Sequence, residues 1–177
     1  ISLIGADAVE YIDIFTSGDL IIAISQSGET ADVLEILEAA QRKKVKIASF
    51  VNMPGSMITR MSDYKFMADA GPEICVMSTK VFTSQIAWGY LISKAATGHF
   101  EDAASQLKKT AELMRVYLED ASNHATLKQT AHTLASAKDI FLLGKYQNFQ
   151  IIKEGMVKLI EGTYKHAHAI PAGDLKH

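Results

Sequence analysis

The feature that most constrains the fold is the segment from Leu20 to Thr30, with the sequence LIIAISQSGET. Its first five residues are a continuous apolar run, which is typical of a strand buried on both faces. A hydroxyl-rich loop interrupts the run at Ser25, and apolar residues return at helical spacing from Val33. A strand, a glycine-containing loop and a helix in this order leave unpaired backbone N–H groups at a helix N-terminus, which suits an anion.

The side chains of this loop indicate which anion it would bind. The hydroxyls of Ser25, Ser27 and Thr30 are neutral donors for phosphate oxygens, and Gly28 allows a tight turn. No lysine follows the glycine, so the loop differs from the Walker A motif, and a phosphate monoester of a small molecule fits it better. The alternative is an ordinary strand-to-helix turn with Thr30 as the N-cap.

The same order of strand, turn and helix continues along the chain. It predicts an α/β fold, a three-layer parallel sheet with helices on both faces, in which ligands bind at the carboxyl ends of the strands. We expect a first α/β domain at residues 1–98, a helical connector at 99–138 and the beginning of a second α/β unit at 139–177. The helix at 81–96 is apolar nearly all round and is expected to be deeply buried. The predicted strands are 20–24, 45–51, 64–68, 140–144 and 166–170, and the predicted helices are 31–42, 56–61, 81–96, 101–120, 122–138 and 149–161.

Composition excludes several classes of function. The 177 residues are 48% hydrophobic and carry 18 basic and 20 acidic side chains, a balance that predicts no nucleic-acid partner. No apolar run reaches membrane-spanning length and no signal-peptide pattern opens the chain, so we expect no membrane partner. The single cysteine, Cys75, favours a reducing, cytoplasmic location and is expected to be a buried small hydrophobe. Because the chain opens at Ile1 and closes at His177 within a motif, we expect a piece of a longer protein.

Glu154, Lys158, Glu161 and Lys165 follow one another at intervals of four, three and four residues, so they are predicted to share one helix face. Such a ladder most commonly decorates an exposed helix. The functional alternative is a carboxylate base beside a lysine. In that case Glu161 would move a proton between adjacent carbons of a sugar, and Lys158 would stabilise negative charge on the oxygen.

His166 and His168 would point to the same side of a strand, as two ligands of a metal would. No cysteine or carboxylate stands nearby at ligand spacing, and Asp174 is only a weak candidate. We therefore favour packing or hydrogen-bonding roles for both histidines, and predict neither a metal nor a cofactor.

Four segments together carry a family resemblance. They resemble the isomerase half of the glucosamine–fructose-6-phosphate aminotransferases (isomerising), which consists of two sugar isomerase (SIS) domains in tandem. On this resemblance the chain would be most of the first SIS domain, the connector and the start of the second. The segments are SQSGETAD (25–32), EICVMSTKVFTSQ (73–85), EGMVKLIEGTYKHA (154–167) and AGDLKH (172–177).

The resemblance implies roles for individual residues. Val76, through its backbone, and Ser78 resemble residues that line the sugar. Glu161 resembles the base that moves a proton between C1 and C2, and Lys158 the lysine beside it. His177 resembles a histidine that assists ring opening of fructose 6-phosphate from the neighbouring subunit, which implies a homodimer. The residues that resemble those holding the sugar phosphate are Ser25, Gln26, Ser27 and Thr30.

Three positions depart from the family pattern: Met77 replaces a small residue, Ile160 a second lysine and Asp174 a glutamate. The family's upstream Gly-Thr-Ser loop, its C-terminal lysine segment and its glutaminase domain are not in this chain. Two alternatives stay open beside the aminotransferase. One is a related deaminase or isomerase without a glutaminase domain, and the other is a non-catalytic SIS module that senses an amino-sugar phosphate.

Overall fold

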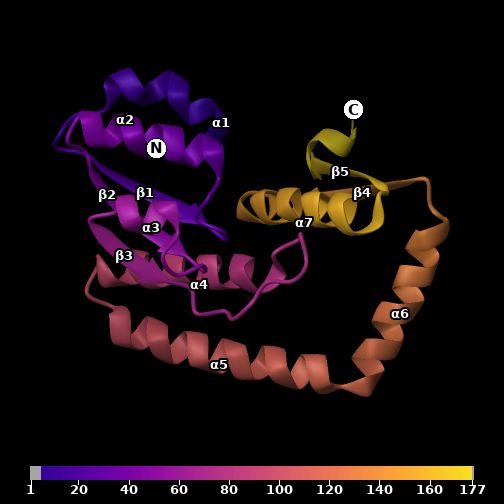
Figure 1. The fold of residues 1–177 in the computed structure, drawn as a ribbon. Coiled ribbons are helices and arrows are strands. Elements are labelled where there is room, and N and C mark those ends of the chain that lie inside the picture. The colour runs from indigo at the N-terminus through magenta and orange to yellow at the C-terminus, as the bar shows by residue number, and fades with distance from the viewer. Residues whose placement is uncertain (1–4, 177) are drawn as a thin grey trace. The chain divides into compact units, whose positions relative to one another are not determined.

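The computed structural model describes residues 5–176. The chain divides into two compact units between Ala96 and Thr97. Figure 1 shows the order of their helices and strands. The three-part division at 98/99 and 138/139 stays a prediction. The elements of the first unit are α1 (Gly5–Ala8), η1 (Val9–Ile14), β1 (Leu20–Ser25), α2 (Ala31–Arg42), β2 (Lys46–Val51), α3 (Met57–Met61), β3 (Tyr64–Met67) and α4 (Thr79–Ala95). Those of the second are α5 (Phe100–Glu119), α6 (Ala121–Ser136), β4 (Asp139–Gly144), α7 (Gln147–Thr163), β5 (His166–Pro171) and η2 (Asp174–Lys176).

The first unit is built on a parallel sheet with the strand order β1-β2-β3 (Figure 1). Ile21 pairs with Ile47 across β1 and β2, and Phe50 pairs with Phe66 across β2 and β3. Because parallel neighbours need a crossover connection, α2 joins the first pair of strands and α3 joins the second. This architecture confirms the α/β fold with parallel strands that the sequence predicts.

Helices cover both faces of this sheet. Alternation along β2 turns Ile47 and Val51 to one face, where a buried cluster forms with α2 and α3. Phe50 points to the other face, where its ring stacks on Trp88 of α4 with centroids 4.7 Å apart. The ring centroid of Trp88 also lies 5.4 Å from that of Phe66. The buried cluster comprises Ala23, Leu37, Ala40, Val45, Ile47, Val51 and Ile58.

Two expectations about burial are wrong for the described residues. The β1 side chains of Leu20, Ile22 and Ile24 are 52%, 45% and 46% exposed, so this strand is not buried on both faces. In α4 only Val81 is buried, although the helix is apolar nearly all round. The reason is geometric: Trp88 of α4 packs on Phe50 of β2 and Phe66 of β3, whereas β1 is one of the two edge strands of the described sheet.

A serine in the middle of β2 gives a stability prediction. Ser49 is fully buried, and its Oγ has no hydrogen-bond partner in the part of the chain that the structure describes. Replacing an unsatisfied buried hydroxyl removes a desolvation cost, so Ser49→Ala is expected to leave stability unchanged or raise it by up to about 1 kcal/mol in urea unfolding. Ser62→Ala is the matched control, since buried Ser62 Oγ donates to Ile58 O at 2.7 Å. The control should lose about 1 kcal/mol, and an equal loss for Ser49→Ala would contradict the prediction.

The second unit contains a parallel pair, β4 and β5, with α7 as the crossover packed on both strands (Figure 1). The pairing sets Asp139 opposite His166 and Phe141 opposite His168. Gly144 ends β4 where the first turn of α7 approaches closely, because a Cβ there would lie 2.9 Å from the backbone carbon and oxygen of Asn148. A strand, a glycine turn and a helix therefore recur in this unit, as the sequence predicts.

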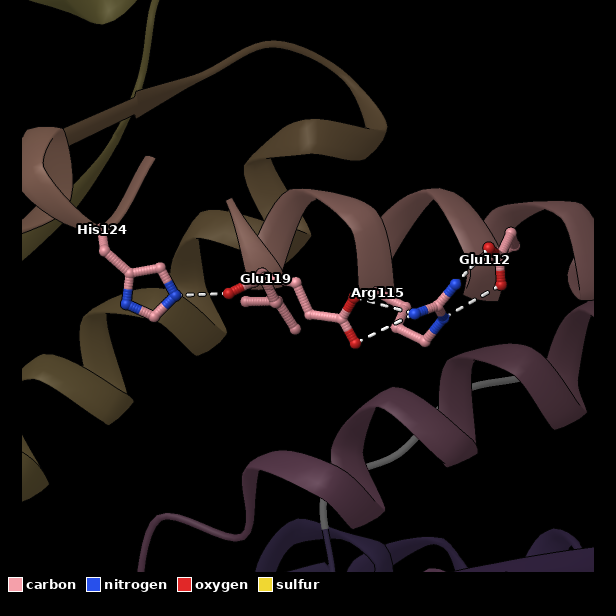
Figure 2. Close-up of polar contacts among 5 residues, drawn as sticks. Glu112, Arg115, Glu119 and His124 are labelled. Carbon is pink, nitrogen blue, oxygen red and sulfur yellow. Dashed lines mark hydrogen bonds and ion pairs between the residues drawn. The ribbon is translucent and has the colours of Figure 1, made fainter. Parts of the chain in front are cut away.

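Helices α5 and α6 meet at a corner where side chains of α6 bond carbonyls at the end of α5. Asn123 Nδ2 donates to Tyr117 O at 3.0 Å and His124 Nε2 contacts Leu118 O, so side chains of α6 satisfy carbonyls at the end of α5. Arg115 lies between two glutamates of α5, 2.5 Å from Glu112 and 2.8 Å from Glu119 (Figure 2). Only Ala103 of α5 is buried, so the two helices are amphipathic segments whose described surface is mostly exposed.

Asp120 is the N-cap of α6, and it gives a prediction on pH. Its Oδ1 accepts hydrogen bonds from Ser122 N at 2.7 Å and Ser122 Oγ at 2.6 Å, which lower the pKa of the Asp120 carboxyl. A carboxyl whose pKa is lowered by folding stabilises the fold above its unfolded pKa, near 3.9, and this contribution is lost as pH falls through the folded pKa.

We therefore expect the stability difference between the wild type and Asp120→Ala to shrink as pH falls below about 4. Urea unfolding followed by circular dichroism at 222 nm, from pH 7 to pH 3, measures this difference. Asp120→Asn keeps the acceptor and does not titrate, so its difference from Asp120→Ala should not depend on pH. If the stability difference between the wild type and Asp120→Ala also did not depend on pH, the assignment of Asp120 as the cap would be contradicted.

Candidate functional site

In the loop between β1 and α2, backbone N–H groups donate hydrogen bonds to serine hydroxyls of the same loop. Gly28 N donates to Ser25 Oγ at 3.0 Å, and Glu29 N donates to Ser27 Oγ at 3.2 Å. Ser25 Oγ also lies 3.3 Å from Thr30 Oγ1. The structure therefore brings together the three hydroxyl residues that the sequence predicts as phosphate ligands, at the carboxyl end of β1.

Thr30 occupies the N-cap position of α2, but its side chain makes no capping bond to that helix in the described chain. Its hydroxyl faces Ser25 instead. The first N–H groups of α2 thus lack the side-chain acceptor that an ordinary cap supplies, and the positive end of the helix dipole stays open. Thr30 is therefore at the N-cap position, as the capping interpretation has it, but its hydroxyl does not make the capping bond.

Neighbouring segments hold this loop in place through its carbonyl groups. Gln26 O accepts from Asn52 N at 3.2 Å, and Gly28 O accepts from Ile58 N at 3.0 Å. Both donors follow β2, so the strand-end loops of β1 and β2 are joined at the carboxyl edge of the sheet.

Asn52 extends this connection to the loop after β3, a role that sequence analysis missed. Its Nδ2 donates to Gly71 O at 2.8 Å, and its Oδ1 accepts from Ala70 N at 3.0 Å. Because the backbone N–H of Asn52 bonds Gln26, one asparagine links all three strand-end loops. A turn signal at Asn52 was the only trace of this in the sequence.

The segment before α4 contains the two residues expected to line a sugar. Val76 is 76% exposed, and Ser78 has a left-handed backbone with φ 52° and ψ 51°. Ser78 is the N-cap position, yet among the described residues its side chain makes no capping bond. Glu73 supplies the cap instead, because its Oε2 accepts from Val81 N at 3.1 Å. Cys75 in this segment is exposed, so its expected burial is wrong.

In the second unit, α7 carries the candidate base. Lys158 Nζ lies 2.7 Å from Glu154 Oε1, and these side chains are only 20% and 32% exposed. Glu161 Oε2 is buried and has no hydrogen-bond partner among residues 5–176. These groups do not form a solvated ladder. A buried carboxylate oxygen without a partner is costly unless a ligand or a proton meets it.

Lys165 does not share this face, contrary to the spacing argument. α7 ends at Thr163, and Lys165 Nζ donates to Ala135 O at 2.6 Å and to Ala137 O at 3.0 Å. It therefore satisfies carbonyls at the C-terminal end of α6, where a cation is favoured by the helix dipole. The prediction extended the helical spacing to Lys165, which lies beyond the end of α7.

The histidines of β5 lie beside an aspartate at the start of β4. Asp139 Oδ1 is 3.6 Å from His166 Nδ1 and 4.0 Å from His168 Nε2. Within residues 5–176 no three His, Cys, Asp or Glu side chains are grouped to hold a metal ion. His177, the candidate for ring opening, lies outside the described residues. None of the described helices has the length and apolar character needed to cross a membrane.

Relatives of known identity match across nearly the whole chain. It is 37% identical over 181 residues to glutamine–fructose-6-phosphate aminotransferase (isomerising) from Pyrobaculum aerophilum, with 100% of this chain and 30% of the relative aligned. The enzyme of that name from Aquifex aeolicus is 38% identical over 176 residues, covering 99% of this chain and 29% of the relative. The chain thus spans about 30% of the length of these relatives.

A solved structure and a family model agree with these relatives. The C-terminal domain of glucosamine-fructose-6-phosphate aminotransferase from Francisella tularensis aligns with a TM-score of 0.77 and 32% identity. The alignment covers 92% of this chain and 48% of that one. The family model described as the SIS domain matches residues 3–95, which include the sheet of the first unit and its hydroxyl-rich loop. The chain belongs to the SIS domain family.

Proposed function

We propose that this chain binds and isomerises the sugar phosphate in a glutamine–fructose-6-phosphate aminotransferase reaction. The observation that carries the proposal is the loop Ser25–Thr30, whose hydroxyls gather beside the uncapped N-terminus of α2. Three hydroxyls and a helix dipole suit the phosphate of a sugar phosphate, and the relatives named above suggest fructose 6-phosphate. In this proposal Ser25, Gln26, Ser27 and Thr30 hold the phosphate.

The sugar would lie against the segment that leads into α4. Val76, through its backbone, and Ser78 line it in this proposal. Support comes from Asn52, whose bonds to Ala70 and Gly71 hold the start of the loop between β3 and α4 at the same edge of the sheet as the hydroxyl-rich loop. One rigid edge can therefore present ligands to both ends of a small phosphorylated sugar.

Isomerisation needs one base that serves two neighbouring carbons. Once the ketose ring opens, ammonia adds at C2 and water leaves, which gives an imine. In our proposal Glu161 removes a proton from C1 and returns it to C2, while the imine nitrogen gains a proton and the C1 hydroxyl loses one, so that the amine stands on C2 and the aldehyde forms at C1. Lys158 stabilises negative charge on the sugar oxygen, and His177 of a neighbouring subunit assists ring opening. The buried, unpartnered Oε2 of Glu161 supports the role of base.

The proposal implies partners beyond the substrate. A homodimer is the minimal active unit if His177 acts across subunits, and a glutaminase domain outside this chain supplies ammonia. We place the reaction in the cytoplasm, where the exposed thiol of Cys75 stays reduced. Neither a nucleic acid nor a membrane takes part in the proposed reaction.

A thermal shift experiment tests the phosphate assignment. Saturating glucose 6-phosphate or fructose 6-phosphate is expected to raise the melting temperature by about 5 °C or more, since a ligand at 100 times its dissociation constant stabilises by about 2.7 kcal/mol. Unphosphorylated glucose and fructose at the same concentration should give no shift, because the loop would recognise the phosphate. Equal shifts with phosphorylated and unphosphorylated sugars would reject the assignment.

A further inference from the structure

We propose that Glu29 is a positioning residue that holds the hydroxyl-rich loop in its ligand-binding shape through a hydrogen bond to α3, and that its negative charge does not contribute. This inference rests on the proposed function, because it concerns the same phosphate loop. Glu29 Oε1 accepts from Met57 N at 2.8 Å, across 28 residues of sequence. In the proposed function the phosphate is held by Ser25, Gln26, Ser27 and Thr30, and Glu29 is not one of its ligands.

The bond matters because α3 is not capped by its own N-cap side chain. Ser56 precedes the helix, but its Oγ lies 2.7 Å from Thr59 Oγ1 and makes no capping bond within the described residues. Met57 N instead donates to Glu29 Oε1, and Ile58 N donates to Gly28 O at 3.0 Å. The first N–H groups of α3 thus find their acceptors in the phosphate loop, and the loop gains two fixed points.

The charge of Glu29 works in the opposite direction. A carboxylate beside a loop that binds a phosphate dianion repels the ligand, although exposure to solvent and salt weakens the effect. A glutamate at this position therefore needs a reason other than charge, and the acceptor for Met57 N supplies one. The hydrogen bond and the charge make opposite predictions for binding, so substitutions can separate them.

Three variants of the full chain separate the two effects. Glu29→Gln keeps the acceptor oxygen and removes the charge, whereas Glu29→Ala removes both. Met57→Pro removes the donor from the other side of the bond, and it also removes the Met57 side chain, whose Sδ accepts from Arg60 Nη2 at 2.8 Å. Proline is tolerated at the first position of a helix, and the backbone of Ser56, with φ −62° and ψ 163°, already has the conformation that precedes proline.

The measurement is the dissociation constant for glucose 6-phosphate by calorimetry, at a temperature where each variant is folded. Glu29→Ala and Met57→Pro should each weaken binding about tenfold, and the double variant should be no weaker than either one. Glu29→Gln should bind as tightly as the wild type or more tightly. Glu38→Ala, at an exposed glutamate of α2, removes a charge elsewhere and should change nothing.

Each result decides between the alternatives. Loss of affinity in Glu29→Gln equal to that in Glu29→Ala would overturn the proposal, because the charge would then be what matters. Additive losses in the double variant would also overturn it. Wild-type affinity in all three variants would remove the positioning role and leave the proposed function intact, whereas no binding by the wild type would overturn both.

Discussion

Gly28→Ala is expected to abolish sugar-phosphate binding and to destabilise the unit Ile1–Ala96 by several kcal/mol. Gly28 has φ +69°, and a residue with a side chain loses about 1–2 kcal/mol in this left-handed region. An added Cβ would lie 2.1 Å from Ser56 Oγ and 2.8 Å from Val51 Cγ1, both of which belong to buried residues. Relieving this overlap adds about 1–3 kcal/mol and shifts the loop whose hydroxyls would hold the phosphate.

Gly55→Ala is the matched control for this prediction. Gly55 has φ +74°, so the backbone cost is the same, but nothing lies within 4 Å of an added Cβ. The control should lose only the 1–2 kcal/mol of the backbone term and should bind glucose 6-phosphate normally. Urea unfolding and calorimetric titration of both variants measure the two effects. Wild-type affinity in Gly28→Ala would show that this loop does not bind the phosphate.

Glu161→Gln is expected to lower the rate of isomerisation by about 10²–10⁴-fold while the dissociation constant for the sugar phosphate changes by less than about threefold. An amide has the shape of the carboxyl group but cannot accept and return a proton. Because Glu161 Oε2 is buried without a partner among the described residues, an uncharged amide is also tolerated in its place. The variant should therefore stay folded.

The measurement is exchange of the sugar C1 proton with deuterated water, followed by NMR in the complete protein. Proton exchange reports on the base directly, and it is measured with ammonia present, because the proposed step removes the C1 proton from the imine. Glu38→Gln, at an exposed position of α2, is the isosteric control and should exchange at the wild-type rate. Undiminished exchange in Glu161→Gln would remove this residue from the mechanism.

The strands, helices and hydroxyl-rich loop of the first unit were predictable because their signals are local. An apolar run such as Leu20–Ile24 favours a strand, and the return of apolar residues at helical spacing marks α2. The predicted boundaries of β1 and α2 agree closely with the structure for the same reason. Alternation of such segments also predicts parallel pairing, since each crossover needs a helix.

The details of the site were not predictable from the sequence, because they depend on partners far along the chain. Thr30 and Ser78 are the residue types that cap helices, yet one hydroxyl turns to Ser25 and the other helix is capped by Glu73. Nothing local to Asn52 indicates that it links three loops. A capping preference says which bonds a side chain can make, whereas the fold decides which partners lie within hydrogen-bond distance.

The sequence by itself determined the α/β class, the place of the hydroxyl-rich loop at a strand's carboxyl end and the candidates Glu161 and Lys158. Only the tertiary structure decided that Glu161 Oε2 is buried without a partner in the described chain, that Lys165 bonds α6 instead of joining the ladder, and that Glu29 bonds α3. The physical reason is the distance along the sequence over which each kind of interaction acts. Secondary structure follows from the period of apolar residues, but burial and hydrogen-bond partners are set by segments that the chain brings together only on folding.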